Sequence, residues 1–310
     1  MIPPLFRVNL LLLCILTAVL AQEVEVKSFD CGVSSLPKLI VNGSTAKPGQ
    51  FPWMVRLTVW FTPSLSLNCG GSIITRRHVL TAAHCVVIGR KKAIRVQARY
   101  GTIHRKQGRT VESEDVLPHP LYKTSPMAYD IAVLLLKKPF QYSNYARPVC
   151  LPKGIMNVVN RNVVVSGWGL HKRARSATDY LQYTVMKVQA SNMCKVYGPH
   201  FSPYTMLCAF KRRTGTCAGD SGGPVATRVK NGRFVQLGIV SYGAGYDCTS
   251  RPKVFTRVDV LMPWTLQQTK NEPLYTELSS DDTVMDSDSP LIPYSFWSDG
   301  SVYEPVYFPM

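Results

Sequence analysis

Short runs of hydrophobic, mostly β-branched residues recur between residues 40 and 270, and Gly, Pro, Asn or basic clusters separate them. The clearest runs are residues 79–80, 94–96, 131–136, 163–165, 235–241 and 254–258. Short strands bounded by turn residues at regular spacing are typical of a β-barrel or a β-sandwich. The pattern therefore predicts an all-β domain over this part of the chain.

One segment, residues 260–270, has the hydrophobic spacing of a helix. Leu261 and Trp264 stand about one turn apart on the same face, and Pro263 is tolerated because it falls in the first turn. We expect this helix to close the domain. Residues 271–310 combine a Ser/Asp-rich stretch with a Pro- and aromatic-rich one, which predicts a tail that is unstructured on its own.

The first 21 residues are predicted to be a secretory signal peptide. Arg7 supplies the positive charge, residues 10–20 supply the apolar core, and Ala21 is a small residue at the cleavage site. A signal anchor is the alternative, which the shortness of the apolar run disfavours. No later run of 18 apolar residues occurs, so no membrane span is expected. The sequence predicts a secreted protein, either extracellular or stored in a secretory granule.

Cysteine usage agrees with that compartment. Of nine cysteines, Cys14 lies in the predicted signal peptide and eight remain. An even number of cysteines in a secreted chain suggests four disulfides, although counting alone leaves their pairing open.

Composition and charge narrow the class of protein further. With 45% hydrophobic and 18% charged residues, the chain is globular rather than collagen-like or of low complexity. Residues 31–270 contain 34 Lys and Arg against 8 Asp and Glu, whereas residues 272–310 contain 8 acidic residues and no Lys or Arg. A body this basic attracts polyanions such as sulfated glycans, and a solvated basic face is the alternative. Nucleic acid is not expected, because no module that reads it is recognisable. The acidic tail either folds back on the basic surface or extends as a solvated appendage.

Three short stretches carry the candidate chemistry. They are Leu-Thr-Ala-Ala-His-Cys at residues 80–85, Asp-Ile-Ala-Val-Leu-Leu-Leu at residues 130–136 and Cys-Ala-Gly-Asp-Ser-Gly-Gly-Pro at residues 217–224. In this order, with His, Asp and Ser at spacings of 46 and 91 residues, they resemble the chymotrypsin-like (trypsin-like) serine endopeptidases over residues 31–270. The resemblance implies an all-β fold of two packed six-stranded antiparallel β-barrels with a C-terminal helix.

The resemblance also assigns a role to each residue. Ser221 is the expected nucleophile, His84 the base that accepts its proton and returns it to the leaving amine, and Asp130 the group that orients the imidazole. The backbone N–H groups of Gly219 and Ser221 are expected to form the oxyanion hole. On its own, His84 would be interpreted as a histidine of the hydrophobic core, and Asp130 as a carboxylate at the edge of a strand. The presence of all three residues in their family motifs favours catalysis. A catalytically silent binding homologue is the alternative function.

Disulfide pairing and domain limits follow from the same resemblance. It implies the four pairs Cys31–Cys150, Cys69–Cys85, Cys194–Cys208 and Cys217–Cys248. It divides the chain into a signal peptide (1–21), a light chain or activation segment (22–39), a protease domain (40–270) and an acidic, aromatic tail (271–310).

Family members are made as zymogens, in which cleavage frees an aliphatic terminus whose ammonium pairs with the Asp before the catalytic Ser. The matching residues here are Ile40 and Asp220. The residue before the expected cut is Leu39 rather than Arg or Lys, and Lys38 precedes it. Either a chymotrypsin-like activator cuts after Leu39, or a trypsin-like one cuts after Lys38. We favour Leu39, because one extra residue would misplace the buried ammonium.

Alignment within the family also places the substrate pocket. Its floor corresponds to Gly215 and Thr216, where trypsin-like enzymes carry Asp, so trypsin-like specificity is disfavoured. Its remaining residues correspond to Ser241, Tyr242, Gly243 and Lys253. A cation at Lys253 is similar to the granzyme B-type arrangement and predicts cleavage after acidic residues. If Lys253 instead turns to solvent or pairs with Asp247, the pocket is neutral and chymotrypsin- or elastase-like.

The remaining expectations concern ligands and partners. Asn42 begins the only N-glycosylation sequon. The loop that binds calcium in some relatives, residues 102–108, lacks the carboxylates that calcium needs, so neither a metal nor a cofactor is expected. The expected partners are protein or peptide substrates, an activating protease and protein inhibitors.

Overall fold

The computed structural model describes residues 30–36, 44–170, 177–243, 248–269 and 272. The predicted signal peptide, the expected cleavage site at Leu39 and Ile40, the sequon at Asn42 and the tail beyond residue 272 lie outside the described residues.

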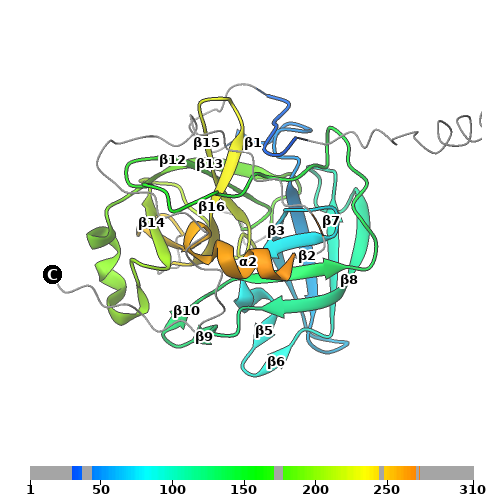
Figure 1. The fold of residues 1–310 in the computed structure, drawn as a ribbon, viewed down its shortest axis with the longest axis horizontal. Coiled ribbons are helices and arrows are strands. Elements are labelled where there is room, and N and C mark those ends of the chain that lie inside the picture. The colour runs from blue at the N-terminus through cyan, green and yellow to red at the C-terminus, as the bar shows by residue number, and fades with distance from the viewer. Residues whose placement is uncertain (1–29, 37–43, 171–176, 244–247, 270–271, 273–310) are drawn as a thin grey trace, which may run out of the picture.

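The first half of the chain forms a closed six-stranded antiparallel barrel (Figure 1). Around the barrel the strands follow the order β11-β4-β3-β2-β7-β8. Their bounds are β2 Met54–Trp60, β3 Ser66–Ile73, β4 His78–Thr81, β7 Arg95–Tyr100, β8 Arg109–Pro118 and β11 Ala132–Leu136. Alternate residues point inward; on β7, for example, Val96, Ala98 and Tyr100 are buried.

The second half forms another closed ring of six antiparallel strands. The order is β13-β12-β15-β16-β17-β14, and a further pairing of β13 with β14 closes the ring. Their bounds are β12 Asn162–Gly167, β13 Gln182–Val188, β14 Met206–Phe210, β15 Pro224–Arg228, β16 Phe234–Tyr242 and β17 Lys253–Arg257. The short strand β1, Ser44–Thr45, adds to the edge of β13. The predicted two-barrel fold is confirmed.

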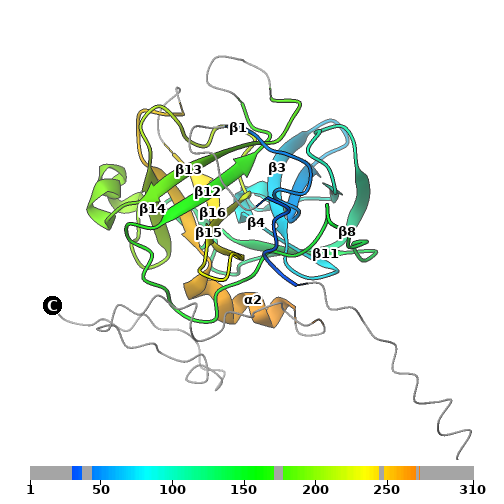
Figure 2. The ribbon, with the colours of Figure 1, turned by 90° about the horizontal axis from the view of Figure 1, so that it is seen from above.

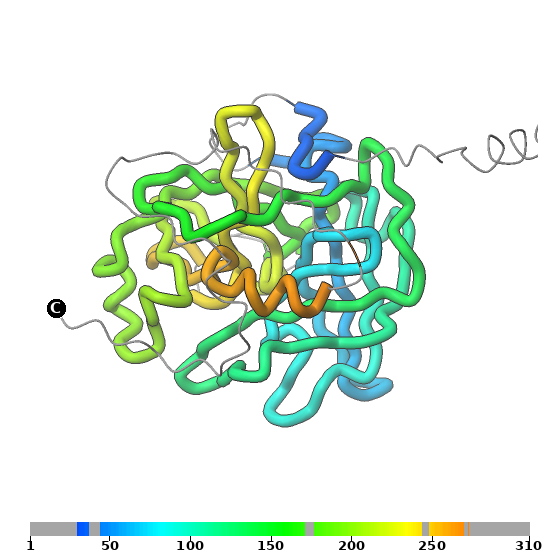
Figure 3. The backbone as a smooth tube through the Cα atoms, in the orientation of Figure 1, coloured from blue at the N-terminus to red at the C-terminus, as the bar shows by residue number. Residues whose placement is uncertain are grey.

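The two barrels pack side by side, as the chain trace in Figure 3 shows. An aromatic cluster joins them: Trp53 from the first barrel contacts Phe234 from the second at 5.3 Å between ring centroids, and Phe51 lies 5.1 Å from Tyr183. Closing each sheet removes exposed edges, and packing the two barrels buries apolar residues from both in one cluster.

Helical structure is sparse. The predicted C-terminal helix is present but shorter than residues 260–270: the 3₁₀ turn η3, Asp259–Leu261, leads into α2, Met262–Gln268, with Pro263 in its first turn. Figure 2 shows α2 along one side of the molecule. Although α2 follows the second barrel, Trp264 contacts His119 of the first barrel at 4.9 Å between ring centroids. The sequence did not predict η2, Ser191–His200, a 3₁₀ segment kinked at Gly198. No helix in the described ranges has the length and apolar character needed to cross a membrane.

Four disulfides brace this architecture. They join Cys31 to Cys150, Cys69 to Cys85, Cys194 to Cys208 and Cys217 to Cys248, the same four pairs that the family resemblance implies. All six cysteines of the first three pairs are buried. The first bridge ties the N-terminal segment at residues 30–36 to the body of the protein.

Candidate active site

His84 lies just beyond β4, in the 3₁₀ turn η1, Ala83–Cys85. Its two neighbours are buried and fix the turn, and the Cys69–Cys85 disulfide holds it against β3. The His84 Nδ1 atom lies 2.8 Å from Oδ2 of Asp130, and the His84 backbone N–H donates to Oδ1 at 2.9 Å. Because both carboxylate oxygens are engaged, the imidazole is held in one orientation, with Nε2 facing away from Asp130.

Asp130 precedes β11 and is 1% exposed. The second barrel also holds it: the Ser241 hydroxyl donates to Oδ2 at 2.5 Å, and the Thr256 hydroxyl donates to the Asp130 backbone carbonyl at 2.8 Å. The sequence placed Ser241 only in the wall of the substrate pocket. Its bond to Asp130 depends on how the barrels pack, and no local pattern signals it.

The contact between His84 and Asp130 shifts the pKa of each group in the direction that favours its charged form. Burial alone would lower the pKa of His84, but the charge of Asp130 and its hydrogen bond outweigh burial, so the pKa of His84 is raised. Burial would raise the pKa of Asp130, but His84 and the Ser241 hydroxyl outweigh it and lower that pKa. Asp130 can therefore stabilise an imidazolium at His84.

Ser221 lies in the tight loop that precedes β15. The Gly70 N–H of β3 donates to the Ser221 carbonyl at 2.7 Å, which fixes the loop against the first barrel. Gly222 has φ +77°, and a Cβ there would lie 2.2 Å from Thr81 Oγ1 and 3.1 Å from Cys85 Sγ. Only glycine fits at this point, beside the turn that carries His84.

The structure thus brings the Ser221 loop to the His84–Asp130 pair. Among the described residues no hydrogen bond joins the Ser221 hydroxyl to His84; the Nε2 atom lies 3.9 Å from Cys85 Sγ. Catalytic hydrogen bonds of this kind often tighten only when substrate is bound. Gly219 has φ +95° and packs against Gly169, where an added Cβ would lie 3.0 Å from the Gly169 Cα.

Asp220 turns away from Ser221, toward β12 and the segment that follows it. Its carboxylate accepts the Gly169 N–H at 2.8 Å and the Cys217 N–H at 2.9 Å. Burial raises the pKa of Asp220 to about 6, against the lowering effect of these two bonds. A cavity of about 400 Å³ adjoins the carboxylate, lined in part by Gly167, Tyr183 and Thr216.

Lys253 begins β17 and is 3% exposed. Its side chain passes between two glycines: a Cβ on Gly215 would lie 3.2 Å from Lys253 Cε, and one on Gly243 would lie 2.9 Å from Lys253 Nζ. The missing side chains at Gly215 and Gly243 therefore make the slot that the lysine fills. Asp247, the partner in the neutral-pocket alternative, lies outside the described residues.

Two other site residues have definite places. Tyr242 ends β16, donates its hydroxyl to the His200 carbonyl and packs edge-on against Tyr197 at 5.5 Å. Thr216 is buried next to the Cys217–Cys248 disulfide. Ligand atoms of Cys69, His84 and Cys85 lie within 4.8 Å of one another, but both sulfurs belong to one disulfide and cannot bind metal as thiolates.

Comparison with known proteins agrees with this geometry. The family model Trypsin matches residues 40–265. Serine proteinase stubble of Drosophila melanogaster is 31% identical over 257 residues, covering 78% of this chain and 33% of the relative. Human transmembrane protease serine 5 is 32% identical over 256 residues, covering 78% and 54%. The chain belongs to the trypsin family of chymotrypsin-like serine proteases.

Solved structures give the same result. HL collagenase superposes with a TM-score of 0.66 at 29% identity, covering 74% of this chain and 99% of the collagenase. The structure of GrC, granzyme C, also gives 0.66 at 26% identity, covering 75% and 100%. The chain spans only about a third to about half of the length of stubble and of the human transmembrane protease.

Proposed function

We propose that this protein is a serine endopeptidase that hydrolyses peptide bonds with His84, Asp130 and Ser221. The observation that carries the proposal is the pair of His84 and the buried Asp130, bonded through both carboxylate oxygens, beside the loop of Ser221. In this mechanism the Ser221 hydroxyl attacks the substrate carbonyl and His84 takes its proton. His84 then gives that proton to the leaving amine, and water repeats the sequence to release the acyl group.

The charge that develops on the carbonyl oxygen needs fixed donors. We assign them to the backbone N–H groups of Gly219 and Ser221, and the φ of +95° at Gly219 supports this because it turns the peptide in a way that a side chain would oppose. Loss of one such donor in related chemistry costs about 3 kcal/mol in the transition state.

Covalent labelling tests the nucleophile. An organophosphonate should label Ser221 in the activated protein, and labelling should vanish in Ser221→Ala while the four disulfides remain. If the activated protein is folded but Ser221 resists labelling, the silent binding homologue becomes the better account.

We also propose that the protein is a secreted zymogen. The cavity at Asp220 supports this, because it adjoins a buried carboxylate that has two N–H donors among its described contacts. An ammonium at Ile40, freed by cleavage after Leu39, would neutralise that carboxylate and order the neighbouring loop. Amino-terminal sequencing of the active form tests the site of cleavage: Ile40 is the expected terminus, and a fully active form that begins at Leu39 would contradict it.

For specificity we propose cleavage after Asp or Glu, directed by Lys253. The lysine lies between the glycines at the floor and wall of the pocket, where a substrate carboxylate would meet a buried cation. In Lys253→Gly the kcat/KM for acidic substrates should fall by about 100-fold, since removing one partner of a buried charge pair costs about 3 kcal/mol. If Lys253→Gly still cleaved equally well after Asp and Glu, the proposal would be rejected in favour of a neutral, chymotrypsin- or elastase-like pocket.

The remaining proposals concern the location, glycosylation and partners of the protein. Four disulfides support an extracellular or granule location, and we propose that Asn42 carries a glycan there. Protein substrates, an activating protease, protein inhibitors and sulfated polyanions are the partners proposed. Enzymatic deglycosylation followed by mass measurement would test Asn42.

A further inference from the structure

Away from the proposed active site, two arginines face each other on the outside of the first barrel. Arg56 of β2 pairs directly with Arg99 of β7. Both point outward, because their neighbours along the strands, such as Leu57 and Ala98, are buried. Like charges placed opposite each other on adjacent strands destabilise a sheet, so this pair calls for a functional reason.

A third arginine, Arg105, approaches from the loop between β7 and β8. Burial lowers the pKa of Arg56, and the charges of Arg105 and Arg99 lower it further. Arg105 lies close to the pair, because the Arg99 guanidinium donates at 3.2 Å to the carbonyl of Lys106, the residue that follows Arg105. Like charges at such close range repel one another. We call the surface formed by Arg56, Arg99 and Arg105 the arginine face.

The hydrogen bonds on the arginine face leave most of its charge uncompensated. Arg56 donates to the neutral amide of Asn68 at 2.8 Å, and Arg99 donates to the Lys106 carbonyl at 3.2 Å. Within the described part of the chain only Arg105 has a carboxylate partner, Asp179 at 2.7 Å.

Further along the same sheet the basic side chains do have a carboxylate partner. Arg95, also on β7, lies 2.6 Å from Glu112 of β8, and Lys137 lies 3.1 Å from the same carboxyl group, so that two cations share one carboxylate. Arg56 and Arg99 have no such partner among the described residues.

An aromatic hollow adjoins the arginine face. Tyr145 and Tyr180 are 54% and 51% exposed, and together with His104 they line a cavity of about 270 Å³. His104 precedes Arg105 in the same loop and packs against Tyr180 at 5.1 Å between ring centroids. A ligand suited to this surface would combine negative charge with aromatic groups.

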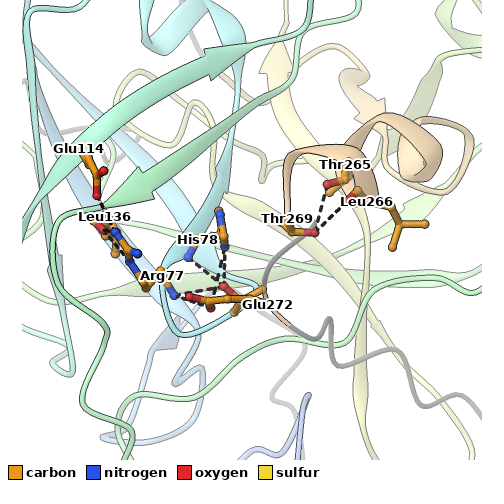
Figure 4. A network of polar contacts seen from close by, with 9 residues as sticks. Arg77, His78, Glu114, Leu136, Thr265, Leu266, Thr269 and Glu272 are labelled. Atoms are coloured by element: carbon orange, nitrogen blue, oxygen red, sulfur yellow. Dashed lines mark hydrogen bonds and ion pairs between the residues drawn. The ribbon is translucent and has the colours of Figure 1, made fainter.

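The chain itself contains such a ligand. Residues 273–310 include 7 acidic residues and 7 aromatic residues but no Lys or Arg. The segment starts from a fixed point on the first barrel: the Glu272 carboxylate accepts the Arg77 N–H at 3.1 Å and lies 4.0 Å from His78 Nδ1 (Figure 4). Thirty-eight residues can extend roughly 125 Å at about 3.3 Å per residue, more than the roughly 45 Å breadth of a domain of this size.

We propose that residues 273–310 bind in cis to the arginine face, with their carboxylates on Arg56, Arg99 and Arg105 and their aromatic groups at Tyr145 and Tyr180. The inference goes beyond the proposed peptidase activity and does not depend on it. In this arrangement the tail competes with any other polyanion for the same surface, so that a partner must displace the tail before it can bind.

Zero-length cross-linking of the full-length protein tests the proposal, because a carbodiimide joins a carboxylate to a lysine only when the two are in contact. Lys106 is exposed and lies in the loop beside Arg99. At low salt, mass spectrometry should find Lys106 joined to Asp or Glu from residues 277–304 in the monomer. The yield should fall about tenfold at 1 M salt, where the screening length is about 3 Å.

Matched variants make the test specific. Arg56→Gln with Arg99→Gln should lower the yield at least about fivefold, whereas Arg56→Lys with Arg99→Lys should keep most of it, since both variants leave the strands intact. Lys195→Gln with Lys230→Gln removes the same charge from exposed positions on the second barrel and should change nothing.

Three results would overturn the proposal. The first is the absence of tail links to Lys106 at low salt, and the second is an equal yield in the glutamine variant. The third is that cross-links between the tail and Lys106 are found only in dimers, which would mean that the tail of a second copy of the chain binds the arginine face. In the first case, binding of heparin to the arginine face would assign the surface to a sulfated glycan instead.

Discussion

At the scale of single residues, Asp220 is a buried carboxylate beside a cavity. Its carboxylate is buried with two backbone donors, and its pKa is raised to about 6 from an ordinary 3.8. A carboxylate with a raised pKa destabilises the folded state once it ionises. The proposed ammonium at Ile40 would compensate this ionisation.

The variant Asp220→Asn tests this effect through pH. Below about pH 3 Asp220 is neutral in both the folded and unfolded states; above about pH 7 it is ionised in both, and burial disfavours the folded one. Between about pH 3 and about pH 8 the stability of Asp220→Asn relative to the parent protein should thus rise by about 3 kcal/mol. Denaturant unfolding across this range measures it, and a flat difference would contradict the raised pKa.

At the scale of elements, the Ser221 loop meets the first barrel through close backbone contacts rather than through side chains. The Gly70 N–H bonds the Ser221 carbonyl, and a Cβ on Gly70 would lie 2.8 Å from the Gly223 Cα. Gly222 is equally enclosed, against Thr81. The glycines beside Ser221 therefore set the distance between the Ser221 loop and the turn that carries His84.

Gly222→Ala and Gly89→Ala form a matched pair for this contact. Both positions have positive φ, +77° and +60°, so alanine strains the backbone at each. Only Gly222 is also enclosed, whereas nothing lies within 4 Å of a Cβ on Gly89. Gly222→Ala should cost about 2 kcal/mol more in free energy of unfolding, or shift the loop and abolish peptidase activity. Equal stability and equal activity in the two variants would argue against the enclosed contact.

At the scale of the whole molecule, the N-terminal segment is part of the folded body. Beyond the Cys31–Cys150 disulfide, the Gly32 N–H donates to the Pro148 carbonyl, and the Phe234 N–H donates to the Gly32 carbonyl, both at 2.8 Å. After cleavage at Leu39 the light chain should stay attached through this bridge.

Intact mass measurement checks the tether. The activated parent should retain the light chain until reductant is added, whereas Cys31→Ser should release it and lose about 2–5 kcal/mol of stability, as expected for removal of a native disulfide. Release of the peptide from the parent without reductant would show that the tether does not hold.

The strand pattern predicted an all-β domain, and the family resemblance carried by three ordered motifs implied its two barrels. It also named both members of the His84–Asp130 pair. It could not predict the Ser241–Asp130 bond, the slot for Lys253 between Gly215 and Gly243, or the anchoring of Glu272. These contacts join residues far apart in the chain, so they depend on how the barrels pack and leave no local signal. The sequence also misplaced the limits of α2: the 3₁₀ turn η3 occupies residues 259–261, and the helix itself covers Met262–Gln268.

The most direct test of the peptidase assignment is a cleavage profile on a peptide library, taken after treatment with a chymotrypsin-like activator and compared with Ser221→Ala. The account predicts hydrolysis after Asp or Glu by the form that begins at Ile40, and none by Ser221→Ala. Hydrolysis after apolar residues would agree with catalysis by His84, Asp130 and Ser221 but would show that Lys253 does not set the specificity. A folded protein that begins at Ile40 and cleaves no peptide would contradict the assignment.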